Sequence, residues 1–191
     1  GVGGHTRNPH VLDRQTCGSS AGSGAAMAAM LAAGTVGTET NGSIICPSQG
    51  NGVVGFKPTV GLVSQAGIVP ISSSQDTAGP MTRTVEGAAM MLTAMATGEG
   101  ATDYVSALSD TSLEGVRIGV LRYSVSDQPG MTDTFNAALE VLEAQGAELV
   151  EIEAFESQIE NFGQKAFTVL IHEFKTTLNE YLEGTPEAVE S

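Results

Sequence analysis

The residues with the clearest potential for chemistry are serines in two glycine-rich segments near the start of the chain. Residues 17–24 are Cys-Gly-Ser-Ser-Ala-Gly-Ser-Gly, and residues 37–44 are Gly-Thr-Glu-Thr-Asn-Gly-Ser-Ile. A serine hydroxyl becomes a nucleophile when a base takes its proton and nearby donors stabilise the oxyanion that forms. Small residues directly before Ser43 allow consecutive backbone N–H groups to converge beside its hydroxyl. The second segment is therefore compatible with a nucleophile and its oxyanion hole.

The first segment also fits an anion-binding site. A Gly/Ser-rich loop that opens a helix presents unpaired N–H groups, and these attract phosphate. Residues 17–24 have neither the GxGxxG spacing nor the Gly-Lys-Ser/Thr ending of phosphate-binding loops. Phosphate binding is therefore the weaker hypothesis for this segment.

The elements that must position these serines belong to a Gly/Ser-rich region, residues 1–100. Small apolar residues predict a buried helix at 23–33, which Gly34 ends. Apolar and β-branched runs predict short strands, and a second helix follows them. These elements are a buried strand at 35–38, a strand at 53–56, short strands and turns over 61–71, and a helix at 85–96.

Residues 101–191 form an acidic second region. Its pattern predicts a strand at 117–121, an amphipathic helix at 132–145 and a strand at 148–152, which is typical of a parallel βαβ unit. A helical pattern then covers residues 157–183, with an expected break near Gly163. Together these elements predict an α/β protein.

Charge and composition narrow the classes of partner. The net charge is −14, and residues 1–100 contribute only −1 of it. Nucleic acid is an unsuitable partner because phosphate neutralisation needs clustered Lys and Arg. No apolar stretch reaches 18 residues, so we expect no membrane partner. Two cysteines are too few for a disulfide scaffold, so we expect a cytoplasmic location. Cys17 and Cys46 are expected to be small buried side chains rather than a bridge.

The order of motifs resembles the amidase signature family. The two serine segments are followed by Gly-Phe-Lys-Pro-Thr at 55–59 and by Gln-Asp-Thr-Ala-Gly-Pro-Met-Thr-Arg-Thr at 75–84. The sequences of residues 37–47 and 57–63 are most similar to those of the peptide-amidase-like branch. This resemblance implies a layered α/β/α fold with a mixed β-sheet, of which this chain holds an incomplete, single core over residues 1–191.

The resemblance also implies a Ser–cis-Ser–Lys mechanism for amide hydrolysis, with release of ammonia. Ser43 would be the nucleophile, and Ser19, held by a cis peptide bond, would be the bridging serine. The backbone N–H groups of Thr40, Asn41, Gly42 and Ser43 would form the oxyanion hole, and the Asn41 side chain would contact substrate. The substrate would be a small or peptide-type carboxamide, and no metal or organic cofactor is implied.

The sequence departs from the family at the general base. In the family a lysine lies well upstream of the bridging serine, whereas no lysine precedes Ser19 here. Lys57, Lys165 and Lys175 lack the burial or cationic neighbours that would activate an amine. We therefore expect the chain to be a fragment whose catalytic lysine lies outside it.

Three alternatives remain open at this stage. The first is a catalytically inactive module that binds a ligand. The second is a relative of the amidotransferases, and the third is a fragment that self-associates through open strand edges.

Nearby polar residues have supporting roles in each case. We expect Ser20 and Ser23 to cap the helix start, and Asp76 to pair with Arg83.

Overall fold

The computed structural model describes residues 3–109, 112–154 and 157–184. The chain forms two compact units, one made of Gly1–Ala107 with Gly163–Ser191 and one made of Leu108–Phe162. Helices and strands alternate along both, so the predicted α/β class is confirmed.

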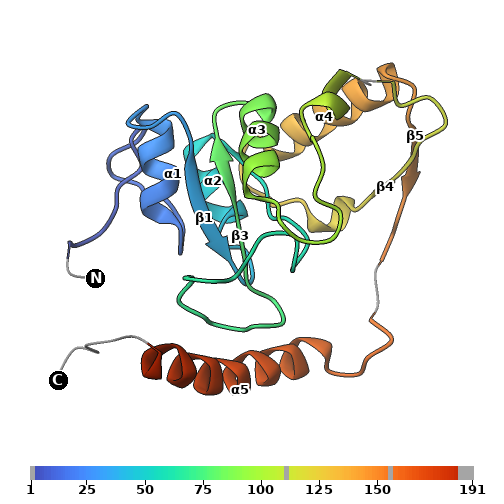
Figure 1. The fold of residues 1–191 in the computed structure, drawn as a ribbon. Coiled ribbons are helices and arrows are strands. Elements are labelled where there is room, and N and C mark those ends of the chain that lie inside the picture. Colours follow the sequence, from blue (N-terminus) through green and yellow to red (C-terminus); the bar gives the residue numbers. More distant parts are fainter. Residues whose placement is uncertain (1–2, 110–111, 155–156, 185–191) are drawn as a thin grey trace. The chain divides into compact units, whose positions relative to one another are not determined.

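A three-stranded antiparallel sheet lies at the centre of the first unit (Figure 1). Its middle strand is β3 (Thr77–Thr82), flanked by β1 (Thr35–Glu39) and β2 (Val54–Gly55). All six residues of β3 are buried, whereas β1 exposes alternate residues. Its exposed side chains include Val36, at 48% exposure, so the prediction of a fully buried strand at 35–38 was wrong. β1 lies at the edge of this sheet and is covered on one face only.

Helices cover both faces of β3, which gives a three-layer α/β/α arrangement (Figure 1). Successive strand residues point to opposite faces. Ala78 therefore packs with Leu92 of α3 (Val85–Met95), while Met81 lies close to Gly24 of α1 (Ala21–Ala28). A third helix, α2 (Ile45–Asn51), packs against α1.

Several boundaries in this unit differ from the sequence-based expectation. α1 ends at Ala28 rather than at residue 33, because the chain turns at Met30 with a φ of 59°. Met30 and Leu31 are 74% and 78% exposed, so the apolar run at 23–33 is not buried throughout. Residues 61–71 form no strand and make only isolated bridges. The expected helix at 85–96 is confirmed.

The second unit is the predicted parallel βαβ unit. β4 (Arg117–Val120) pairs in parallel with β5 (Glu148–Glu151), and α4 (Met131–Ala144) connects them. Short 3₁₀ turns lie before and after β4, at Ser106–Ser109 and Arg122–Ser124. The buried apolar side chains among the described residues of this unit are Val120, Leu139 and Ala147.

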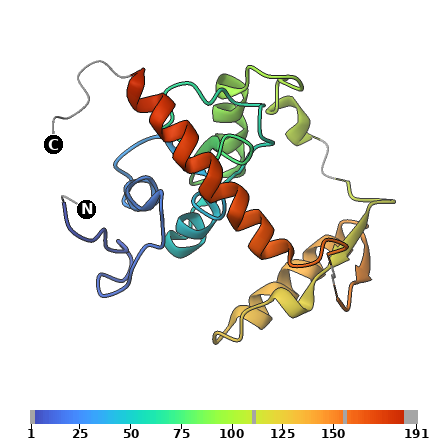
Figure 2. The same cartoon turned by 90° about the horizontal axis from the view of Figure 1, so that it is seen from below.

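The last described helix, α5 (Phe162–Glu183), is long and exposed (Figure 2). It begins at Phe162, so the helical pattern expected at 157–161 does not form helix. None of its described residues is buried, and Phe167 on its apolar face is 62% exposed. Within the described ranges, no helix combines the length and apolar character that a membrane crossing requires.

Gly79 is expected to tolerate no side chain, because β3 is packed closely from both sides. A Cβ there would meet the carbonyl oxygen of Phe56, and would approach Pro58 Cδ at 2.8 Å and Ile44 Cδ1 at 3.0 Å. Gly79→Ala should lower the free energy of unfolding by about 2 kcal/mol or more, measured by urea denaturation. Gly22→Ala is the matched control: it lies in α1 with open space around it, and should be neutral or stabilising by about 0.5 kcal/mol. Equal effects at both sites would contradict the packing described here.

Candidate active site

The structure brings the two serine-rich segments together. The Ser20 N–H donates to the Ser43 carbonyl oxygen at 3.1 Å, and Ser19 and Ser43 line the same narrow pocket. The peptide bond between Gly18 and Ser19 is cis, as the resemblance implied. Two serines separated by 24 residues in sequence therefore face one space.

The turn at residues 40–43 follows directly from the end of β1. Gly42 has a φ of 86°, a conformation that favours glycine. Among the described residues, no hydrogen bond occupies the backbone N–H of Asn41 or of Ser43. Thr40 also lines the serine pocket, whereas Asn41 is exposed on the turn and is not among the lining residues. The turn thus has donors available for a ligand.

Glu39 holds one side of this turn, and sequence reasoning missed it. Its buried carboxylate accepts hydrogen bonds from the N–H groups of Ile44 at 2.7 Å and Ile45 at 2.9 Å. Burial raises the pKa of Glu39, but these N–H groups, that of Gly42 and the charge of Lys57 outweigh it, so the pKa is lowered. The carboxylate therefore stays ionised and occupies the orphan donors where α2 begins.

Asp76 holds the same turn from the other side. Its carboxylate accepts a hydrogen bond from Thr40 Oγ1 at 2.5 Å and bonds from the N–H groups of Ile71 and Ser72 at 2.8 and 2.9 Å. The expected pairing with Arg83 was wrong, since Arg83 donates to the Ala32 carbonyl at 3.2 Å. Asp76 precedes β3 and Arg83 follows it, so the whole strand separates the two residues.

Ser20 and Ser23 do not cap α1, contrary to expectation. Ser20 is the N-cap residue, yet its side chain makes no capping bond. Its Oγ instead bonds both the N–H and the carbonyl of Thr38, each at 3.1 Å. Ser23 Oγ donates to the Val36 carbonyl at 2.8 Å. Both serines attach α1 to the exposed edge of β1, where unpaired backbone groups are available.

A disulfide bridge joins Cys17 and Cys46, so the expectation of two unpaired cysteines was wrong. Their Cα atoms lie 5.8 Å apart, within the range that a bridge requires. One cysteine stands two residues before Ser19 and the other three residues after Ser43. Because the serine segments converge, their flanking cysteines also meet.

None of the chain's lysines is placed as the expected general base. Lys57 Nζ donates to the Thr40 carbonyl at 3.1 Å and so supports the turn. Lys165 and Lys175 are exposed on α5. In the described residues no group of three His, Cys, Asp or Glu side chains is arranged to hold a metal ion.

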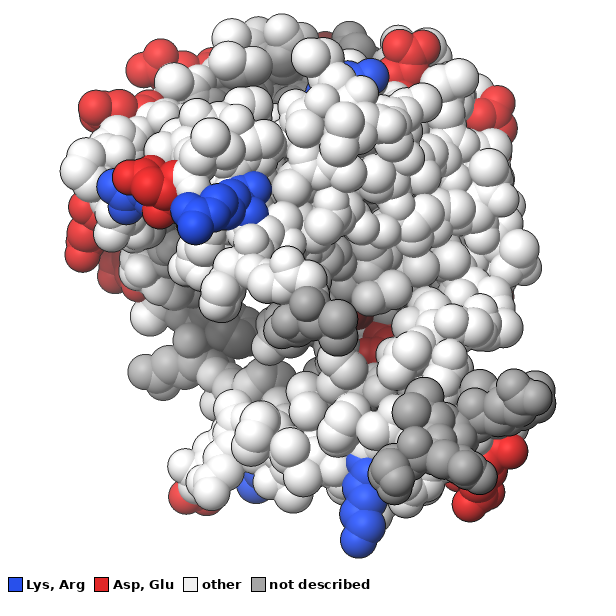
Figure 3. All heavy atoms as spheres, turned by 90° about the vertical axis from the view of Figure 1, so that its left-hand side faces the viewer, with Lys and Arg blue, Asp and Glu red and all other residues white. Residues whose placement is uncertain are grey.

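The serine pocket is lined by polar and β-branched residues from three segments of the first unit. Its lining residues are Ser19, Thr38, Glu39, Thr40, Ser43, Ile68, Val69, Ile71 and Asp76. On the face shown in Figure 3, uncharged side chains predominate and Lys and Arg are few and scattered. Within the pocket, the hydroxyl groups of Ser19, Thr38, Thr40 and Ser43 can hydrogen-bond a polar group such as an amide.

Comparison with known proteins identifies the family. The family model "Amidase" matches residues 1–190. The chain belongs to the amidase family. It is 44% identical to the peptide amidase of Stenotrophomonas maltophilia, whose crystal structure superposes with a TM-score of 0.87 over 95% of this chain and 39% of that one. This amidase-family chain therefore shares the fold of part of that enzyme.

Two sequence relatives extend the comparison. A putative amidase of Arthroderma benhamiae is 40% identical over 81% of this chain and 29% of its own length. A glutamyl-tRNA(Gln) amidotransferase subunit of Thermosynechococcus vestitus is 44% identical over 78% of this chain and 33% of its own length. The chain thus spans about a third of the length of the relatives it matches, in line with the expected fragment.

Glu39→Gln should destabilise the protein in a pH-dependent way. The amide cannot reproduce a charged acceptor for the N–H groups of Ile44 and Ile45, so we expect a loss of about 2 kcal/mol at pH 7. Because folding lowers the pKa of Glu39, its contribution is present above the ordinary pKa and is lost as the pH falls through the folded value. Urea denaturation at pH 7 and pH 3 should show the gap between variant and wild type closing at low pH. A gap that stays constant with pH would contradict this role.

Reduction of the bridge between Cys17 and Cys46 should also destabilise the protein. The bridge spans 29 residues, and opening a loop of this size costs about 3 kcal/mol of unfolding free energy. Thermal denaturation with and without dithiothreitol measures the change. The double variant Cys17→Ser with Cys46→Ser is the control. Its denaturation midpoint should equal that of the reduced protein and should not change when dithiothreitol is added. A wild-type midpoint that the reductant leaves unchanged would contradict the bridge.

Proposed function

We propose that the chain carries the nucleophile and the oxyanion hole of an amide hydrolase that releases ammonia from a carboxamide. The observation that carries this proposal is the meeting of Ser19 and Ser43 in one pocket beside a turn with available N–H donors. The family membership supports the same reaction.

In the proposed reaction Ser43 Oγ attacks the amide carbonyl carbon. Its proton passes to Ser19 Oγ, whose own proton is taken by a base. The carbonyl oxygen becomes an oxyanion, which is stabilised by the N–H groups of Asn41 and Ser43, the turn donors that no hydrogen bond occupies among the described residues. The C–N bond then breaks, the nitrogen takes a proton through Ser19 and leaves as ammonia, and water hydrolyses the acyl ester on Ser43.

The base in this proposal is an amine supplied from outside the 191 residues. Lys57 is committed to the Thr40 carbonyl, and the lysines of α5 are exposed. Activation of an amine as a base needs burial or cationic neighbours, which an exposed lysine lacks. Ser19 therefore needs a proton acceptor from outside the part of the chain that the structure describes.

A second candidate is amide hydrolysis that delivers ammonia to a partner protein. It is favoured by the 44% identity to a glutamyl-tRNA(Gln) amidotransferase chain. Direct RNA contact by this chain is disfavoured by its net charge of −14. Comparison of free glutamine with peptide amides as substrates separates the two candidates, since amidotransfer of that kind would favour glutamine.

The role of Ser43 is tested by covalent labelling. With a primary alkylamine added as the base, a fluorophosphonate should form an adduct on Ser43, located by peptide mass spectrometry, and Ser43→Ala should lose it. Ser64→Ala, an exposed serine outside the pocket, should label as the wild type does. Absence of an adduct in folded protein with the amine present would favour the ligand-binding alternative over the hydrolase.

The missing base is tested by chemical rescue. Ammonia release from a peptide amide should be slow with the chain alone and should rise with added primary alkylamine in the wild type. Ser43→Ala and Ser19→Ala should show no rise. Full activity without an added amine, lost in Ser43→Ala, would show that the chain supplies its own base and would overturn that part of the proposal.

A further inference from the structure

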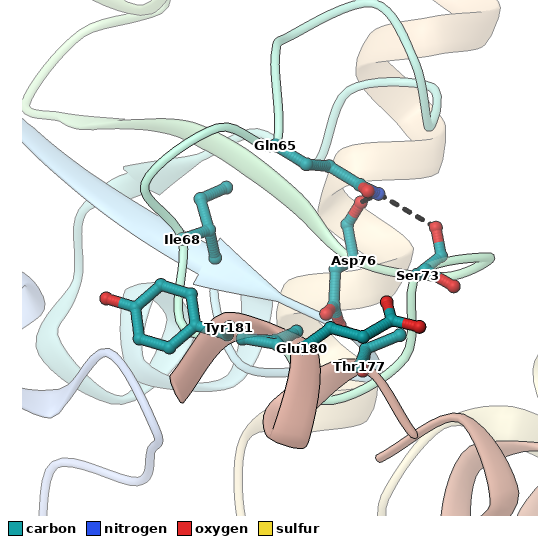
Figure 4. Close-up of a pocket in the computed structure, with 8 residues that line it drawn as sticks. Gln65, Ile68, Ser73, Asp76, Thr177, Glu180 and Tyr181 are labelled. Carbon is teal, nitrogen blue, oxygen red and sulfur yellow. Dashed lines mark hydrogen bonds between the residues drawn. The ribbon is translucent and has the colours of Figure 1, made fainter. Parts of the chain in front are cut away.

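A second pocket adjoins the serine pocket (Figure 4). It has a volume of about 320 Å³ and shares Ile68 and Asp76 with the serine pocket. One wall is the loop that holds these two residues, and the other is α5, through Thr177, Glu180 and Tyr181. A molecule whose amide lies at Ser43 could therefore extend into this second pocket.

One carboxylate of α5 accepts several hydrogen bonds from the loop. Glu173 accepts hydrogen bonds from Ser72 Oγ at 2.5 Å, from the Ser74 N–H at 3.1 Å and from Ser74 Oγ at 2.9 Å. These bonds lower the pKa of Glu173, so it stays ionised. Thr177 and Glu180 lie one and two turns further along the same helix face. Glu173 thereby positions the wall of the second pocket.

The second pocket has an uncompensated negative charge. Its lining residues include two carboxylates and no Lys, Arg or His. Both oxygens of Asp76 are already occupied by Thr40, Ile71 and Ser72. Glu180 has no side-chain hydrogen bond or ion pair with any other residue in the part of the chain that the structure describes. Its carboxylate is the group left to meet a ligand.

We propose that this second pocket receives the acyl portion of the substrate and selects a cationic group there through Glu180. The inference rests on the proposed function, because the amide must lie at Ser43. A primary amide loses only ammonia, so any bulky part of the substrate belongs to its acyl side. The preferred substrates are carboxamides that carry an ammonium or guanidinium group, such as the amides of basic amino acids and peptides.

Equilibrium binding tests this selection without relying on catalysis. The Ser43→Ala chain is titrated with N-acetyl-arginine amide, N-acetyl-norleucine amide and N-acetyl-glutamate amide and followed by NMR. The arginine amide should bind about fivefold more tightly than the norleucine amide, as expected for a partly solvated ion pair. The glutamate amide should bind more weakly than both.

Two variants, each made on the Ser43→Ala chain, assign the preference to its residue. Glu180→Gln should remove the difference between the arginine and norleucine amides. Glu86→Gln removes one charge from the exposed start of α3, so it should keep the fivefold preference. Equal binding of the three amides, no binding of any, or a preference that survives Glu180→Gln would overturn the proposal. A chain that binds the arginine amide selectively but gives no adduct at Ser43 would keep this selection and reject the hydrolase.

Discussion

The geometry around Ser43 depends on one buried carboxylate. The N–H groups of a turn that bind a ligand are not available for hydrogen bonds within the turn. Other groups must therefore hold such a turn in place. Glu39 does this by accepting the N–H groups of Ile44 and Ile45, the first donors of the following helix. Those donors would otherwise be unpaired inside the protein, which is costly. Glu39 also accepts the Gly42 N–H, while the N–H groups of Asn41 and Ser43 have no hydrogen bond among the described residues.

Around this anchor, the remaining contacts restrict the turn from every side. Asp76 holds the Thr40 hydroxyl and Lys57 holds its carbonyl. The bridge between Cys17 and Cys46 joins the segment of one serine to the helix that follows the other. Such pre-organisation matters because donors fixed in advance need no rearrangement when charge develops on the substrate. The site is thus held by polar and covalent contacts more than by a large apolar core.

The sequence predicted the elements with strong local patterns and missed those set by tertiary contacts. The βαβ unit around α4 and the helix α3 follow their hydrophobic periodicity, and both were predicted correctly. β3 was missed because Gly79 and Pro80 are rare in a central strand. It is nevertheless buried, since its neighbours approach so closely that little space remains for side chains.

In the candidate site, too, residues within a distinctive local motif were predicted, and residues whose role depends on tertiary contacts were missed. The motifs pointed to Ser19, Ser43 and the 40–43 turn because their residue types are distinctive, and the structure brings the two serines into one pocket. Glu39 carries no local signal: it is one acidic residue in a short strand, and its role appears only when α2 begins beside it. The bridge between Cys17 and Cys46 was likewise missed. The frequency of disulfides in proteins with few cysteines does not reveal that the segments of these two residues converge in the fold.

The attachment of α5 has a consequence for how this protein can change over evolutionary time. The groups proposed to break the amide bond come from residues 19–43, whereas the second pocket takes one wall from a helix more than a hundred residues further along the chain. That helix has no buried side chain among its described residues and is tied to the loop through Glu173. Substitutions along its inward face can therefore accumulate without disturbing the sheet or the serines. Descendants of one ancestor could then diverge in substrate preference while their bond-breaking apparatus stays the same.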